Sequence, residues 1–120
     1  MKQHQAINAY NMLEKLSENE HLSAAAQWEI YKLRKLLRPR VEFQQEREEA
    51  IREKYRPFAN EQGTLEGEKS LEFMKELQAL SYLDAEIEPF ERPKIETVQG
   101  ITCKTMEPLE EFIEFTRPAE

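Results

Sequence analysis

A run of basic side chains near the middle of the sequence is the feature best suited to a chemical role. Residues 32–40 contain five basic residues and no acidic one. Such a run can lie on phosphate groups, where each neutralised phosphate makes binding salt-dependent, or on an acidic protein surface. From residue 84 to the C-terminus, ten acidic residues outnumber four basic ones. We expect a solvated helix face directed at acidic surface, either this chain's own C-terminal part or a neighbour's, formed by Lys32, Arg34, Lys35, Arg38 and Arg40.

The other reactive side chains form no recognisable catalytic or metal-binding pattern. His4 and His21 are the only histidines, and neither has a carboxylate or thiol at a spacing typical of a metal site, so surface or capping roles are expected. Cys103 is the only cysteine, and because no local motif supplies a base, we expect a small buried hydrophobic residue and not a nucleophile. The carboxylates of residues 46–53 are interleaved with basic residues, as on a solvated helix face. The sequence therefore predicts no enzyme, no cofactor, no metal and no small-molecule ligand.

Composition narrows the class of protein further. The 120 residues suit one domain with a modest core, and a formal net charge of −7 disfavours general binding to nucleic acid. A single cysteine leaves no intrachain disulfide framework and suits a reducing compartment. The N-terminus lacks the apolar segment that a signal peptide needs, and no run approaches the length of a membrane span. We therefore expect a cytoplasmic protein without membrane contact.

Residues 23–58 organise the predicted fold, because they read as one very long helix bent at Pro39. Pro39 lacks the amide hydrogen that would bond to the carbonyl of Lys35, so it should kink or split the helix, and the strong helix formers around it favour a kink. At about 1.5 Å per residue the helix would be roughly 50 Å long, whereas a compact chain of this size has a radius of gyration of about 14 Å. The helix should therefore extend beyond the body of the protein.

Apolar side chains recur along one side of this helix at three- and four-residue spacing. Gln44 and Glu48 interrupt the series, which predicts that the two halves pack against different elements or that the centre is solvated. The second half needs a cover, either from a later segment that folds back or from another chain. The apolar residues are Ile30, Leu33, Leu37 and Val41 in the first half and Ile51, Tyr55 and Phe58 in the second.

Two further helices are predicted on either side of the long one. Residues 3–18 form the first, Ser23 should cap the long helix, and Trp28 near this corner is expected in the core. The long helix should end near Asn60, and residues 68–83 should form a third helix that returns antiparallel and covers the second apolar group. The resulting two-helix stalk would have little core of its own, which favours lateral association with a copy or a partner. The broad apolar face of the third helix contains Leu71, Phe73, Met74, Leu77 and Leu80.

The apolar period changes after residue 82. Residues 85–89 and 101–103 alternate apolar and polar side chains, as half-buried strands do, and Gln99-Gly100 is a candidate hairpin turn. Thr105 should cap a short last helix that ends at Pro118. The predicted fold class is mainly α, of the α+β type: a long kinked helical hairpin with a small antiparallel β element and a short C-terminal helix. One domain spans 1–120, with 1–83 as the helical hairpin or stalk and 84–120 as a small α/β cap.

The segments of residues 25 to 116 follow one another in a set order. This order is WEIYKLRKLLRPRVEFQQEREEAIREKY, a glycine-containing break, FMKELQAL, the acidic AEIEPF and a final PLEEFIEF. It resembles a family of small uncharacterised proteins of bacteriophages and prophages of Gram-positive bacteria. The resemblance implies a phage-derived protein without an assigned activity, and it carries over no catalytic residues.

These observations lead to three hypotheses on function. The first is a non-enzymatic phage or prophage protein that acts through protein-protein contact, by self-association or by docking on a protein partner, for example as a structural or assembly component. The alternative is a small acidic inhibitor of a host defence or nucleic-acid enzyme, whose C-terminal part imitates phosphate charge. A nucleic-acid-binding accessory protein ranks below both because of the net charge. The protein is expected in the host-cell cytoplasm or in a virion, and its predicted partner-binding residues are Lys32, Arg34, Lys35, Arg38, Arg40, Ile51, Tyr55 and Phe58.

Overall fold

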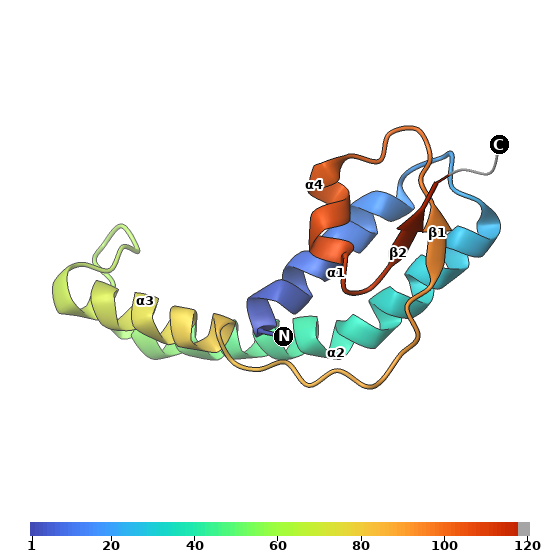
Figure 1. Cartoon of the computed structure of the whole chain (residues 1–120). Helices are drawn as coiled ribbons and strands as arrows, with labels where there is room; N and C mark the ends of the chain where they lie inside the picture. The colour runs from blue at the N-terminus through green and yellow to red at the C-terminus, as the bar shows by residue number, and fades with distance from the viewer. Residues whose placement is uncertain (118–120) are drawn as a thin grey trace.

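The computed structural model describes residues 1–117 and is mainly helical, with one long helix and a small two-stranded sheet. The molecule is elongated, 61 × 29 × 19 Å along its principal axes. Figure 1 shows a bulky body at one end and a narrow two-helix arm at the other. In chain order the elements are α1 (Gln3–Ser17), α2 (Ala24–Tyr55), the 3₁₀ turn η1 (Arg56–Phe58), α3 (Gly67–Ser81), β1 (Lys94–Glu96), α4 (Cys103–Met106), the 3₁₀ turn η2 (Glu107–Leu109) and β2 (Glu114–Thr116).

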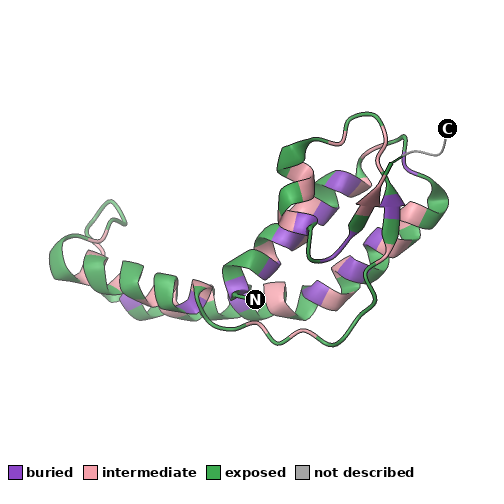
Figure 2. Cartoon of the chain, viewed as in Figure 1, coloured by how far each residue is buried: buried purple, intermediate pink, exposed green. Residues whose placement is uncertain are grey.

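The body contains the hydrophobic core, which α1 and the first half of α2 share with the C-terminal third of the chain. Leu13 of α1, Leu37 of α2 and Leu109 of η2 are each completely buried. Figure 2 shows buried residues concentrated where these elements meet, whereas the arm is mostly exposed. The helix α1 therefore belongs to the body, where it packs on both α2 and η2. The core residues are Ala6, Ala9, Leu13, Leu16, Leu22, Ile30, Leu33, Leu37, Ile95, Leu109, Phe112 and Ile113.

The helix α2 is continuous over 32 residues, which corresponds to about 48 Å. It begins as predicted, because the Ser23 hydroxyl accepts a hydrogen bond of 3.1 Å from the Ala26 amide. The helix continues through Pro39 without splitting, and Figure 1 shows its axis changing direction between the two halves. The Gln3 side-chain amide donates to the Arg40 carbonyl and so ties α1 to the middle of α2. The radius of gyration is 18.1 Å, above the value of about 14 Å for a compact chain, which confirms the predicted overhang.

We call the second half of α2 (residues 41–55), η1 and α3 the arm. Figure 1 shows α3 lying along this half of α2. The Tyr55 ring meets the edge of the Phe73 ring with centroids 5.6 Å apart, and the Lys54 ammonium lies 2.6 Å from the Glu76 carboxylate. A later segment of the chain thus covers part of the apolar series in the second half of α2.

The polar interruption in α2 marks the boundary between the two packing environments. Gln44 is buried, and its amide donates a hydrogen bond of 2.9 Å to the Glu48 carboxylate one turn later. The first half of α2 packs mainly against α1, and the second half packs against α3. The prediction that the two halves pack against different elements is confirmed.

The sheet differs from the prediction, because its two strands are parallel. β1 pairs with β2 in a register that places Ile95 opposite Phe115. Between the strands the chain turns at Gly100, where φ is +94°, and passes through α4 and η2 before it enters β2 in the same direction. Parallel neighbours require such a crossover, whereas an antiparallel pair can be joined by a tight turn. The predicted antiparallel element and its hairpin at Gln99-Gly100 are therefore wrong.

The predicted strands outside β1 and β2 do not form among the described residues. Residues 85–89 have no regular structure, and residues 101–102 lead into α4, which begins at Cys103. Ala85 and Ile87 nevertheless pack against the core, so the alternation there reflects an extended segment that lies on the body. The last helical turn ends at Leu109, and residues 114–116 form β2 instead of the expected helix. The predicted stop at Pro118 lies outside the described residues.

Candidate protein-interaction surfaces

One face of α2 presents two aromatic rings and three cations to solvent. Trp28 and Tyr31 are 58% and 49% exposed, and their rings stack with centroids 5.4 Å apart and planes at 22°. Ile30 and Leu33 point the other way and fill the side of the helix that packs in the core. The prediction that Trp28 lies in the core is therefore wrong. We call Trp28, Tyr31, Lys32, Lys35 and Arg38 the aromatic-basic face.

The basic run is divided between this face and contacts inside the body. Three of its members are exposed on the face. Arg34 is half-buried, and its guanidinium lies 5.1 Å from the centroid of the Tyr10 ring and 3.4 Å from its hydroxyl. Arg40 is also half-buried, at the point where Gln3 bonds to its carbonyl. Arg34 thus joins α1 to α2, and only the exposed members can meet a partner without disturbing the body.

Ion pairs within the chain leave most of this positive charge without a counterpart. Within residues 1–117, Lys32 pairs with Glu29 at 3.0 Å, while Lys35 and Arg38 form no ion pair. The described part of the chain also holds no ion pair between residues 32–40 and the acidic segment that begins at residue 84. The expectation that the run faces the chain's own acidic C-terminal part is therefore not met by any ion pair among the described residues.

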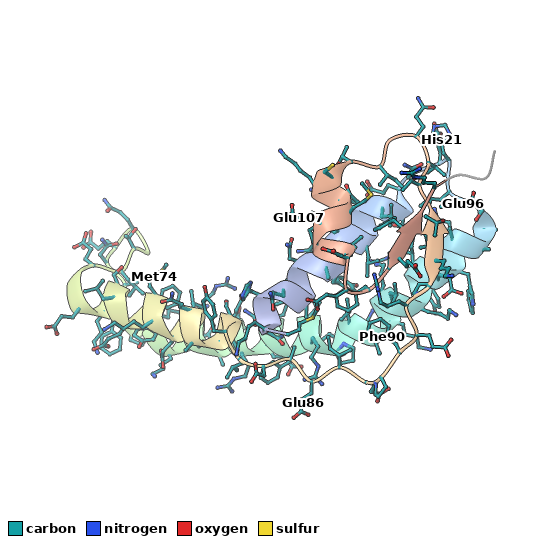
Figure 3. All side chains as sticks on the ribbon, in the orientation of Figure 1. His21, Met74, Glu86, Phe90, Glu96 and Glu107 are labelled. Carbon is teal, nitrogen blue, oxygen red and sulfur yellow. The ribbon has the colours of Figure 1, made fainter. Side chains whose placement is uncertain are left out.

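A surface hollow of about 410 Å³ adjoins the face on the side of Lys32. Arg92 is fixed at its rim, because the guanidinium donates to the carbonyl oxygens of Glu110 and Ile113. Phe90, labelled in Figure 3, stacks on buried Phe112 with centroids 5.5 Å apart. The hollow is lined by apolar and basic side chains with two carboxylates: Leu33, Leu36, Phe90, Pro93, Lys32, Arg92, Lys94, Glu29 and Glu91.

The predicted contact residues of the arm have different surroundings. Tyr55 is buried against Phe73, and Ile51 is half-buried, so both serve packing within the chain. Phe58 remains exposed, and the Lys69 ammonium lies 4.4 Å from its ring centroid. The third helix therefore covers only part of the second apolar group, and Phe58 is the member that stays open to solvent.

The outer side of α3 is an exposed surface that the sequence interpretation missed. Leu71 and Met74 are 64% and 58% exposed, and Figure 3 labels Met74 on the arm. The sequence pattern places both residues on one broad apolar face. In the structure, a single neighbouring helix covers only the part of that face that carries Phe73 and Leu80. The width of the apolar sector was the signal for a second surface. We call Leu71, Met74 and Gln78, together with the residue that caps the helix, Tyr82, the outer stripe of α3; all four are exposed at helical spacing.

Electrostatic contacts link the interior of α3 to α2 and the segment just after α3 to the N-terminus. The neighbouring Glu76 carboxylate, together with burial, raises the pKa of the Tyr55 hydroxyl to about 12. The Lys54 ammonium, and then the Tyr55 hydroxyl, lower the pKa of Glu76. Just after the helix, the Lys2 ammonium lies 2.7 Å from the Asp84 carboxylate and lowers the pKa of that carboxyl group.

The residues considered for chemistry are scattered over the surface. His4 and His21 are exposed, and the His4 ring lies 5.0 Å from the ring of Tyr82. Cys103 is exposed at the start of α4, so the prediction that it is buried is wrong. Among residues 1–117, no group of three or more histidine, cysteine or acidic side chains is placed to hold a metal ion.

Comparison with known proteins finds no match for this chain among family models, curated proteins or solved structures. The resemblance to phage and prophage proteins therefore stays a prediction. Within the described residues, none of the helices combines the length and the apolar character that crossing a membrane requires.

Proposed function

We propose that this chain is a non-enzymatic phage or prophage protein that works through protein-protein contact, and that its aromatic-basic face binds an acidic protein partner. The phage origin rests on the resemblance of residues 25 to 116 alone. The contact function rests on the surfaces of the molecule.

The observation that carries this proposal is the exposed stack of Trp28 on Tyr31 among cations. Exposing large aromatic rings to water is unfavourable in free energy. Tryptophan, tyrosine and arginine also dominate the binding energy of protein interfaces. The stack also fixes both rings in one arrangement before a partner arrives, so little side-chain freedom is lost on binding. The five residues of the face span one side of α2 over about 15 Å.

The charge of the face supports an acidic protein over a nucleic acid. Lys35 and Arg38 form no ion pair within residues 1–117, so a carboxylate of a partner can approach them directly. Nucleic acid binds more extended basic surfaces than the three cations of this face provide. The neighbouring hollow, with Lys32, Arg92 and Lys94 around apolar residues, offers a place for one side chain of the partner.

The arm suits a structural or assembly role for the same protein. We propose that the arm acts as a kinked helical hairpin, the stalk that holds the body at a distance from the other end of the molecule. Phe58 and the outer stripe of α3 place apolar residues along this stalk for further contacts. A protein of this kind would work in the cytoplasm of the host cell or within the virion.

Fluorescence of Trp28 provides a direct test, because it is the only tryptophan in the chain. Poly-L-glutamate is titrated into the protein at low salt, and oligo-dT of similar charge is titrated in parallel. The proposal predicts that poly-L-glutamate shifts or quenches the emission at saturable concentrations and that oligo-dT acts far more weakly. A response to oligo-dT alone would favour a nucleic-acid partner, and no response to either polymer would contradict the proposal.

A second candidate function is the small acidic inhibitor, and one observation favours it. Glu107, Glu110 and Glu111 are exposed in and just after η2, and none of them forms an ion pair within residues 1–117. Closely spaced carboxylates without counterions can imitate a row of phosphates. For this candidate, the E107Q/E110Q/E111Q variant should lose binding to a basic, nucleic-acid-binding enzyme, whereas charge reversal on the aromatic-basic face should not affect it.

A further inference from the structure

The helix α3 is apolar on two sides, and only one of them is covered. Phe73 and Leu80 pack toward α2 and the body, and Leu80 is the only buried residue of the helix. Leu71 and Met74 on the outer stripe face solvent instead. A helix with this much apolar surface is normally packed on more than one neighbour. We therefore expect a second element to pack on the exposed side of α3, and the described residues of this chain do not provide one.

The charges beside the outer stripe show which element fits. Glu68, Glu72 and Lys75 lie along one edge of the stripe and are exposed. Within the chain, Glu72 pairs with Lys69 at 3.3 Å, whereas Glu68 and Lys75 form no ion pair among residues 1–117. When two copies of a helix pair antiparallel about a two-fold axis, the same edge of both helices meets. A two-fold axis that passes beside α3, at the level of residues 72 and 73, places Leu71 opposite Met74 of the copy. The same axis places Lys75 between Glu68 and Glu72 of the copy, within one helical turn of each.

We propose that the outer stripe of α3 is an interface with a second copy of this chain, in which two α3 helices pair antiparallel. The edge carries both signs of charge in an order that complements itself after the two-fold rotation. An acidic partner would instead need a uniformly basic edge, such as the aromatic-basic face provides. The pairing also gives α3 its second packed side, and it uses a surface separate from the face on α2.

Sedimentation equilibrium of the full chain tests the pairing. The wild type is expected to show a concentration-dependent dimer with a dissociation constant in the micromolar range, since the contact is small. The K75E variant, which turns attraction into repulsion at two symmetric positions, is expected to weaken the dimer by at least about tenfold. The K15E variant makes the same charge change on α1 and is expected to leave the dimer unchanged.

A mixing experiment separates loss of pairing from loss of folding. The E68K/E72K variant should also be monomeric, because it sets three lysines along the edge. An equal mixture of K75E and E68K/E72K should form a heterodimer, because each edge then carries a single sign opposite to that of the other. A wild type that stays monomeric at about 1 mM, or a mixture that stays monomeric, would overturn the inference. All these variants leave the aromatic-basic face intact, so its binding to poly-L-glutamate is measured independently.

Discussion

The Tyr55 ring meets the edge of the Phe73 ring, with centroids 5.6 Å apart, and this contact attaches α3 to the far end of α2. Few other side chains of the arm are buried, whereas the body has a core built from several elements. The arm should therefore open locally at a lower free energy than the body.

Substitution of Phe73 should loosen the arm and leave the body folded. Phe73→Ala removes the ring that contacts Tyr55, at an expected cost of about 2 kcal/mol of local stability, since the side chain is only half-buried. Hydrogen exchange should show faster exchange of the α3 amides and unchanged exchange of the α1 amides. Leu71→Ala on the exposed side of the same helix is the matched control at protein concentrations where the chain is monomeric, with an effect within about 0.5 kcal/mol. Equal effects of the two substitutions would contradict this packing of α3.

The ionisation of Tyr55 should be delayed relative to the other tyrosines. Its pKa is about 12 in the folded protein against an ordinary value of 10.0. Because folding favours the neutral phenol, the stability that this group contributes is fully present below about pH 10 and is lost as the pH rises toward 12. Absorbance titration should show one tyrosine in the wild type that ionises at a higher pH than the others. This transition should be absent in Tyr55→Phe and should move to lower pH in Glu76→Gln. Simultaneous ionisation of all four tyrosines would rule out the contact with Glu76.

The exposure of Trp28 should appear in both quenching and stability. Acrylamide should quench its fluorescence nearly as well in the folded protein as in urea, because the indole is 58% exposed. Trp28→Ala should cost less than about 1 kcal/mol, mainly the stack on Tyr31. Leu13→Ala, at a completely buried position, should cost about 2–5 kcal/mol in the same urea titration. A tryptophan shielded from acrylamide would place this residue in the core after all.

The start of α2 should depend on the hydroxyl of Ser23. Ser23→Ala removes the acceptor for the Ala26 amide and should cost about 0.5–2 kcal/mol in urea unfolding. Ser23→Asp keeps an acceptor at the same place and adds favourable charge at the helix N-terminus, so its stability should equal or exceed that of the wild type. If Ser23→Ala and Ser23→Asp have equal free energies of unfolding, the cap at Ser23 does not contribute to stability.

The sequence predicted the elements that depend on local signals. The cap at Ser23, the continuous long helix and the helices on either side of it follow from side-chain chemistry and helical periodicity, which act within a few residues. The C-terminal third was predicted poorly, because its strands are only three residues long and their pairing depends on a crossover through α4 and η2. A pattern of three residues cannot specify whether its partner runs parallel or antiparallel.

The sequence predicted only part of the candidate surfaces, because the exposure of a side chain also depends on contacts with distant segments. Composition identified the basic run, but only the fold shows that Arg34 is used against Tyr10 and that Lys35 points outward. The prediction that Trp28 lies in the core rests on its size and its place near the start of α2, although this residue lies on the side of α2 opposite to Ile30. Helical periodicity, applied to this position, would have placed it correctly.

The central claim is that the aromatic-basic face binds an acidic protein partner. Calorimetric titration with poly-L-glutamate tests it most directly when two variants of equal net charge are compared. K32E/K35E/R38E reverses the cations of the aromatic-basic face, and K15E/R47E/K104E reverses three exposed cations elsewhere. The account predicts that the first variant loses at least about tenfold in affinity, because specific charge pairs are lost. The second variant should bind nearly as well as the wild type at moderate salt. Equal loss in both variants would show that net charge alone governs binding, and the aromatic-basic face would then not be a docking surface.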